Sequence, residues 1–191
     1  MAQLKQEIED FFRTVAAGKA EIYNEFSVQH ELGIFLRERI GAEYKVQFER
    51  PVSFFGIDRV KTRKKEIDIA VFSKDRRLRH AIELKFPRSG QHPEQMFKAC
   101  EDICFVEQLV GAGFSTGHFV MVADDPLFYS GPSSIGIYRY FRGGTPLCGV
   151  VTKPTGAKDD QVEIKGTHRV AWIPVLKALH YSIVSVASSK V

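Results

Sequence analysis

The chain has 191 residues, of which 44% are hydrophobic, so it is long enough for one well-buried domain and short for two. Its 27 Lys and Arg against 23 Asp and Glu leave a net charge of +4, an excess too small to identify a binding partner by itself. The sequence contains no run of about 18 apolar residues and no secretory-signal pattern, which argues against a membrane span and against export and predicts a cytoplasmic protein. It also contains no C-x-x-C pair, which argues against a disulfide framework or a zinc site.

Two helices are predicted first in chain order. The opening segment predicts a short amphipathic helix, because apolar residues recur at helical spacing before Gly18: Leu4, Ile8, Phe11, Phe12 and Val15. A stronger apolar stripe from about 21 to 40 predicts a second helix, and Gly41 stands where a left-handed C-cap is expected.

The pattern then changes to the period of two that is typical of strands. Segments 44–56, 66–73 and 79–86 are rich in β-forming residues and predict an antiparallel meander, with Pro51 indicating an edge or a bulge. A helix beginning near Pro93 and ending at Gly111 follows, and 118–123 predicts a buried strand.

The remainder of the chain predicts a β-rich extension from about 130 to 191. Five short strand-like segments are separated by turn residues: 135–141, 147–151, 161–166, 168–175 and 181–187. The whole order predicts a single α+β domain over residues 1–191, with a core at about 21–123 in which helices pack on a mixed sheet.

The second and third predicted strands place charged residues on one face. If "KDRR" at 74–77 forms a tight turn, antiparallel pairing puts Asp68 opposite Glu83 and Glu66 opposite Lys85. Ala70 pairs on the same face with a second alanine, which indicates that this face is at least partly covered.

Two carboxylates opposite each other on a covered sheet face require compensation, because like-charge pairs across strands destabilise a sheet by about 0.2 to 1 kcal/mol. A hard divalent cation provides it, and magnesium needs only one or two carboxylates besides water. Lys85 would then lie where it can orient or deprotonate metal-bound water or stabilise charge on a phosphate. The alternatives are a solvated hairpin face and a simple ion pair between Glu66 and Lys85.

The segments "EIDIAVF" and "AIELKF" together resemble the PD-(D/E)XK, or restriction-endonuclease-like, superfamily, whose signature is an acidic residue in one strand and Glu-x-Lys in the next. The resemblance covers about 21–123, where the predicted element order is also that of the superfamily's core. It implies Asp68 as the motif aspartate, Glu83 as the metal-binding acid and Lys85 as the catalytic lysine. Ile67 stands where the superfamily's name places proline.

The resemblance further implies hydrolysis of nucleic-acid phosphodiester bonds with Mg²⁺ or Mn²⁺. Its metal ligands would be Asp68, Glu83, the main-chain carbonyl of Leu84 and a Glu of the first core helix, for which Glu31 is the candidate. Glu31 lies at the rim of its helix's apolar stripe, where a merely solvated side chain is the alternative. In the helix after the third strand, Gln95 is the expected polar residue near the site.

Basic residues cluster on both sides of the strand that carries Asp68, at 59–65 and 74–79. Such clusters suit a phosphate backbone, although exposed loops often carry Lys and Arg for solvation alone. We therefore expect a nucleic-acid partner, with DNA favoured over RNA, and the candidate contacts are Arg63, Lys64, Lys65, Arg76, Arg77, Gln95 and Lys98.

Two competing interpretations are a nuclease-fold module that binds nucleic acid or protein without cutting, and a plain α+β interaction domain. High sequence specificity would require the β-rich extension, a homodimer or a larger defence or repair complex.

Overall fold

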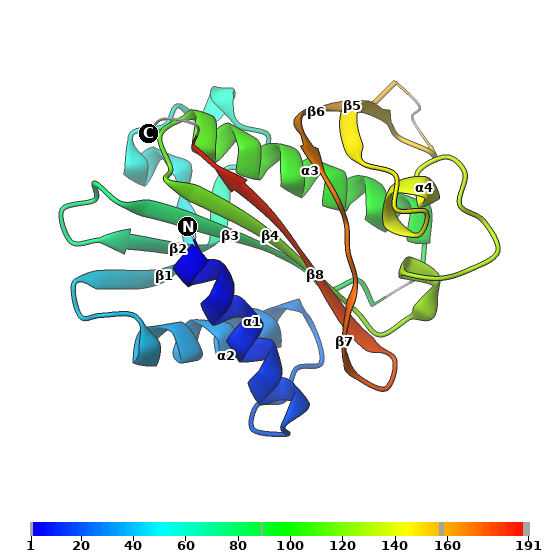
Figure 1. Ribbon diagram of the computed structural model, residues 1–191. Helices are drawn as coiled ribbons and strands as arrows, with labels where there is room; N and C mark the ends of the chain where they lie inside the picture. Colours follow the sequence, from blue (N-terminus) through cyan, green and yellow to red (C-terminus); the bar gives the residue numbers. More distant parts are fainter. Residues whose placement is uncertain (1, 89, 157–158, 189–191) are drawn as a thin grey trace.

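A computed structural model of the protein describes residues 2–88, 90–156 and 159–188 (Figure 1). Its centre is a mixed sheet in the strand order β1-β2-β3-β4-β8-β7. Helices α1 and α2 cover one face of this sheet, and α3 covers the other (Figure 1). The predicted α+β class with helices packed on a mixed sheet is confirmed. The helices are α1 (Ala2–Ala16), α2 (Glu25–Arg39), α3 (His92–Gly111) and α4 (Tyr138–Phe141).

The first three strands form the predicted antiparallel meander. They are β1 (Tyr44–Pro51), β2 (Glu66–Ser73) and β3 (Arg79–Lys85). Strand β1 lies at the edge of the sheet, which suits Pro51 because a proline cannot donate to a further strand. Beyond Pro51 the chain turns into the 3₁₀ helix η1 (Val52–Phe55), so the predicted strand 44–56 is shorter than expected.

Helix α3 connects β3 to β4 (Thr116–Ala123), which pairs parallel to β3. The C-terminal segment then contributes to two sheets. Strands β7 (Ile173–Leu176) and β8 (Leu179–Ala187) extend the main sheet through antiparallel pairing of β8 with β4, whereas β5 (Leu147–Thr152) and β6 (Gln161–His168) form a separate hairpin on the α3 side (Figure 1). The β-rich extension is therefore partly continuous with the core.

Helix α2 begins four residues later than predicted because a capping box determines its start. The Ser27 N–H donates to Asn24 Oδ1 at 2.8 Å, and the Asn24 N–H donates to Ser27 Oγ at 3.0 Å. The helix ends at an extended Ile40, so the expected left-handed cap at Gly41 is wrong. Within the helix, Gly33 is required by packing, since an added Cβ would lie 2.1 Å from the Phe48 ring.

The predicted strand at 135–141 is also wrong, because residues 138–141 form the single turn α4. Tyr140 and Phe141 are adjacent and both buried in the α3-side core. Two adjacent residues of one strand would not both point into the same core, since neighbouring side chains of a strand point to opposite faces. None of the helices in the described ranges combines the length and apolar character that crossing a bilayer requires.

Candidate active site

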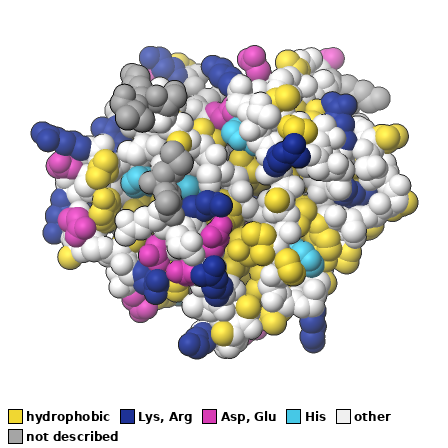
Figure 2. All heavy atoms as spheres, viewed as in Figure 1, with side chains coloured by type: hydrophobic (Ala, Val, Ile, Leu, Met, Phe, Trp, Pro, Cys, Tyr) yellow, Lys and Arg dark blue, Asp and Glu magenta, His cyan; other side chains and the backbone are white. Residues whose placement is uncertain are grey.

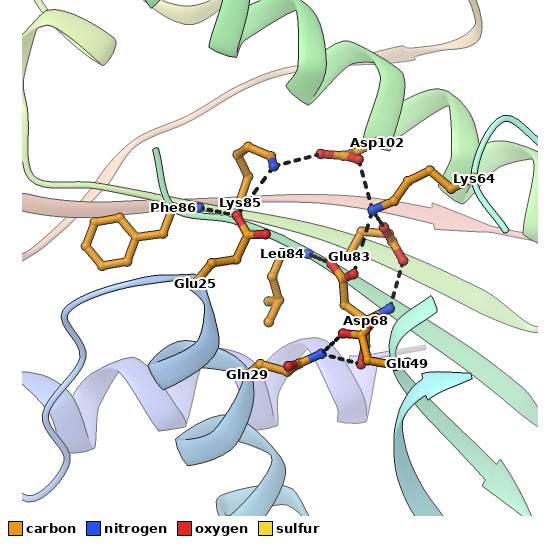
Figure 3. Close-up of polar contacts among 10 residues, drawn as sticks. All are labelled: Glu25, Gln29, Glu49, Lys64, Asp68, Glu83, Leu84, Lys85, Phe86 and Asp102. Carbon is orange, nitrogen blue, oxygen red and sulfur yellow. Dashed lines mark hydrogen bonds and ion pairs between the residues drawn. The ribbon is translucent and has the colours of Figure 1, made fainter. Parts of the chain in front are cut away.

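The hairpin carboxylates lie where β2 and β3 stop pairing. Regular pairing follows the predicted register and ends at Ile69 and Ile82. Beyond that point, Leu84 N–H donates to Asp68 Oδ2 at 2.7 Å and Asp68 N–H donates to Glu83 Oε1 at 3.2 Å (Figure 3). Each carboxylate thus binds the main chain of the opposite strand, and the two acids are held together at the end of the ladder.

Lys64 lies within this acidic site, although the sequence suggested it as a nucleic-acid contact. Its ammonium donates to Glu83 Oε2 and lies 3.2 Å from Asp102 Oδ1 and 3.7 Å from Asp68 Oδ1. We call Asp68, Glu83 and Asp102 the acid cluster. Because α3 supplies Asp102, this cluster joins the end of the hairpin to the helix above it (Figure 3).

Burial controls the protonation of the acid cluster. Glu83 has no exposed area, and burial followed by the nearby Asp68 raises its pKa well above the usual value despite Lys64. Burial also raises the pKa of Asp68, and it raises the pKa of Asp102 to about 6. Burial opposes the charge of Lys64, yet the three carboxylates raise the pKa of this lysine. The three acids therefore favour the charged form of Lys64.

Lys85 is held between helices α2 and α3. Its Nζ lies 3.4 Å from Glu25 Oε2 and 4.0 Å from Asp102 Oδ2 (Figure 3). Glu25 also accepts a hydrogen bond from Phe86 N–H at 3.0 Å, which fixes its carboxylate. The ion pair with Glu66 that sequence pairing suggested is replaced by these two contacts, because Lys85 lies beyond the last regular pair of the hairpin.

Helix α2 presents Glu25 and Gln29 to the site, one turn apart on the same face. Gln29 Nε2 donates to the Asp68 carbonyl at 2.8 Å and to Glu49 Oε1 at 2.5 Å. Glu31, the residue expected from the sequence, lies outside this set of contacts, and its carboxylate lies 3.3 Å from His30 Nδ1. Two residues along a helix correspond to a rotation of about 200°, so Glu31 and Gln29 point to different sides.

A small hollow lies at the α2 side of the site. Its volume is about 30 Å³, enough for a water molecule or two. A group as large as a nucleotide base does not fit in it. The lining residues are Glu25, Phe26, Gln29, Glu49, Asp68 and Leu84.

Arg63 and Lys65, like Lys64, were predicted as nucleic-acid contacts and have partners within the protein. Arg63 pairs with Glu101 and, at 2.8 Å, with Asp160, so it ties the segment before β2 to α3 and to the β5–β6 connection. Lys65 Nζ donates to main-chain carbonyls of its own segment, at Arg59 and, at 2.9 Å, Thr62. Because of these contacts, Arg63 and Lys65 have fewer donor groups left with which to bind a ligand.

The other predicted contacts lie outside the acid cluster and make no contact with it. Arg76 and Arg77 lie in the β2–β3 turn beyond Ser73, and Ser73 is already about 17 Å along the strand from Asp68 at about 3.3 Å per residue. On α3, Gln95 is half-buried and Lys98 is exposed. Basic and acidic side chains are interspersed over the face of the molecule seen in Figure 2.

Several residues of the site were not predicted from the sequence, among them Asp102 and Glu25. Asp102 was not assigned a role from the sequence, but it is buried and pairs with Lys64 and Lys85. A signal for it existed, since Asp102 adjoins the apolar stripe of its helix. Glu25 carried no comparable signal, because acidic residues are common in the first turn of a helix.

Asp68 and Glu83 are the two side chains of the site that could hold a hydrated Mg²⁺ or Mn²⁺ ion. In the described parts of the chain, no three or more His, Cys, Asp or Glu side chains are grouped so as to hold a metal. Magnesium, however, is commonly bound through one or two carboxylates with several waters, and Asp68 and Glu83 supply that pair. Asp102 Oδ2 is a buried acceptor without a hydrogen-bond partner among these residues. Lys64 competes for the same Glu83 oxygen.

Comparison of the chain with protein-family models, with curated proteins and with solved structures finds no match. What the site can do therefore follows from its own residues. The paired carboxylates can attract a hard cation, while Lys85 can attract an anion from a neighbouring position. A phosphate ester is a substrate that makes use of both charges.

Proposed function

We propose that the protein is a metal-dependent nuclease of restriction-endonuclease-like fold that hydrolyses phosphodiester bonds in nucleic acid, with DNA favoured over RNA. The reciprocal hydrogen bonds of Asp68 and Glu83 at the end of the β2–β3 ladder are the observation that carries the proposal. They bring two oxygen donors together beside Lys85, which follows Glu83 by two residues in the same strand.

The arrangement of the elements around the site supports the same proposal. Helix α2, the β1–β2–β3 meander, the crossover helix α3 and the parallel strand β4 follow one another in the order that the superfamily's core has. The acid cluster lies where the meander meets both helices, which allows groups from three elements to act on one substrate.

Asp68 and Glu83 would hold the Mg²⁺ or Mn²⁺ ion, with the Leu84 carbonyl as a further ligand. When bound, such an ion polarises a phosphoryl oxygen and lowers the pKa of a coordinated water. Glu83 is buried, Asp68 is half-buried, and both carboxylates accept main-chain hydrogen bonds, which would keep them oriented before the metal arrives.

Lys85 would stabilise negative charge on the phosphate. Its ammonium is directed by Glu25 and Asp102, so it need not be reoriented when the substrate binds. Gln29 would support the site by holding the Asp68 carbonyl and thereby the end of β2. Arg76, Arg77, Gln95 and Lys98 would act at longer range on the nucleic-acid backbone.

Lys64 favours a second candidate, a nuclease-fold module that binds nucleic acid or a protein without cutting. Its ammonium donates to Glu83 and approaches the other two acids, and so provides the charge compensation that a metal would otherwise supply. If Lys64 stayed bound to the acids in place of a metal, the protein would keep the shape of the site but would not hydrolyse phosphodiester bonds.

A cleavage assay separates the candidates. Single-stranded DNA, duplex DNA and RNA are incubated with the protein in Mg²⁺, in Mn²⁺ and in EDTA. We expect cleavage that requires the metal and falls at least about 100-fold in Asp68→Ala and Lys85→Ala, whereas the exposed α3 variant Lys98→Ala loses much less. Binding without cleavage in every condition would support the second candidate, and absence of both binding and cleavage would contradict the two proposals.

A further inference from the structure

The side chain of Phe26 stands in solvent at the mouth of the hollow beside Asp68. It is 76% exposed and borders the hollow together with Asp68 and Leu84. In the described residues, its ring is part of none of the three hydrophobic clusters. Phe26 is therefore an unpartnered aromatic ring next to the two carboxylates of the proposed nuclease site.

The start of α2 fixes the position of this ring. The capping box of Asn24 and Ser27 holds the first turn, and Glu25 turns inward to Lys85 and to the Phe86 N–H. Phe26 is the next residue, so its side chain is rotated by about 100° from that of Glu25. The same turn thus directs one residue into the site and the next across its entrance.

Position distinguishes Phe26 from other exposed apolar residues. Single exposed hydrophobic side chains are ordinary on protein surfaces. Val60 and Ile135 are 85% and 79% exposed, but neither borders the hollow beside the acid cluster. An aromatic ring at the entrance, by contrast, meets whatever part of the substrate remains outside the hollow.

For a nucleic acid, that part is a base. The hollow of about 30 Å³ admits water but no base, so a nucleotide whose phosphate approaches Asp68 and Glu83 must leave its base outside. A base is flat and apolar on its faces, and an exposed aromatic ring stacks on it without regard to sequence. Stacking requires a free face, and bases inside an intact duplex have both faces covered.

We propose that Phe26 is a base-stacking platform and that the substrate at the site is a single-stranded segment of nucleic acid. This inference rests on the proposed nuclease function and narrows its substrate class. Tyr23, 64% exposed and three residues before Phe26, adds a second ring at the same end of α2.

The test compares cleavage of one DNA sequence as a single strand and as a blunt duplex, in Mn²⁺, with 2-aminopurine as a fluorescent base. We expect the wild type to prefer the single strand by at least about tenfold and to quench the 2-aminopurine on binding. Phe26→Ala should lower kcat/KM on the single strand about tenfold, the value of one base–aromatic contact, with little change on the duplex. Phe26→Trp should restore the rate and the quenching, and Ile135→Ala should change neither.

The outcomes also separate this inference from the proposed function. Metal-dependent cleavage that is equal on both substrates, or that is unchanged in Phe26→Ala, would contradict base stacking by Phe26. It would not contradict the nuclease function. A wild-type dimer that becomes monomeric in Phe26→Ala, as measured by light scattering, would assign the ring to contact with a second copy and would also overturn it. Cleavage of no substrate by the wild type would instead refute the nuclease function itself.

Discussion

The ammonium of Lys64 donates a hydrogen bond to the fully buried carboxylate of Glu83. The same ammonium lies 3.2 Å from Asp102 Oδ1 and 3.7 Å from Asp68 Oδ1, so one cation serves three acids. Because the lysine precedes β2 and Asp102 belongs to α3, this group also links the hairpin to the helix. We expect the stability of the site, and the metal binding that we propose for it, to depend on this group.

Removal of this cation should destabilise the fold. Lys64→Met leaves Glu83 buried without its charged partner, and we expect the free energy of unfolding in EDTA at pH 7.5 to fall by about 2 kcal/mol. Urea unfolding measures the change. Lys61→Met, an exposed position in the same segment, should stay within about 0.5 kcal/mol of the wild type. Adding Glu83→Gln to Lys64→Met should recover part of the loss, and a double variant no more stable than Lys64→Met would contradict this cause.

The same substitution should strengthen metal binding. A ligand that binds only the folded state raises its stability by an amount that grows with metal concentration, about 2.7 kcal/mol at 100 times Kd. Without the Lys64 ammonium at Glu83, the manganese-induced rise in Tm should be larger in Lys64→Met than in the wild type, and it should be absent in Asp68→Ala. Equal rises in the wild type and Lys64→Met would show that Lys64 and the metal do not compete.

Glu25 and Glu31 provide a matched pair on one helix. Glu25→Gln retains an acceptor for the Phe86 N–H but removes the charge that holds Lys85, so we expect kcat/KM to fall about tenfold through a displaced ammonium. Glu31→Gln makes the same chemical change away from the site and should leave the rate unchanged. A larger loss in Glu31→Gln than in Glu25→Gln would restore the assignment that the sequence suggested.

The titration of Asp102 should make acid conditions stabilising over a limited range. Burial raises its pKa to about 6 in the folded state, above the value near 3.8 of the free side chain. Between those values the folded protein binds more protons than the unfolded chain, so stability falls as pH rises from about 4 to 6, by at most about 3 kcal/mol. The stability of Asp102→Asn, measured in EDTA, should lack this decrease. If the stability of the wild type and that of Asp102→Asn change in parallel with pH, Asp102 is not the cause of the decrease.

His118 should have the opposite effect over an overlapping range. It is fully buried between Thr116 and Ser185, and burial lowers its pKa to about 4 from the ordinary 6.5. The unfolded chain then binds more protons between these values, so this contribution of up to about 3 kcal/mol is complete above pH 6.5 and is lost as pH falls toward 4. His118→Gln should remove the loss in urea titrations from pH 4 to 7. If His118→Gln loses as much stability as the wild type when the pH falls toward 4, other groups cause the loss.

The positions of β2 and β3 and their pairing were predictable because they depend on short-range rules. A period of two, a four-residue polar turn and the side-chain alternation of strands are all contained in the order of residues from 66 to 86, and the register agrees for every regular pair from Ile69 to Phe72. The convergence of Asp68 with Glu83 follows from that register.

The amino-acid order by itself therefore determined the α+β class, the meander and the carboxylate pair, since each arises from neighbours along the chain or across one turn. Only the tertiary structure decided that Lys64 joins the acids while Lys65 turns to main-chain carbonyls, that Glu25 rather than Glu31 meets Lys85, and that Asp102 is buried. The reason is that these contacts form between layers. The packing of α2 and α3 onto the sheet selects which of several similar charged side chains loses its water and finds a partner.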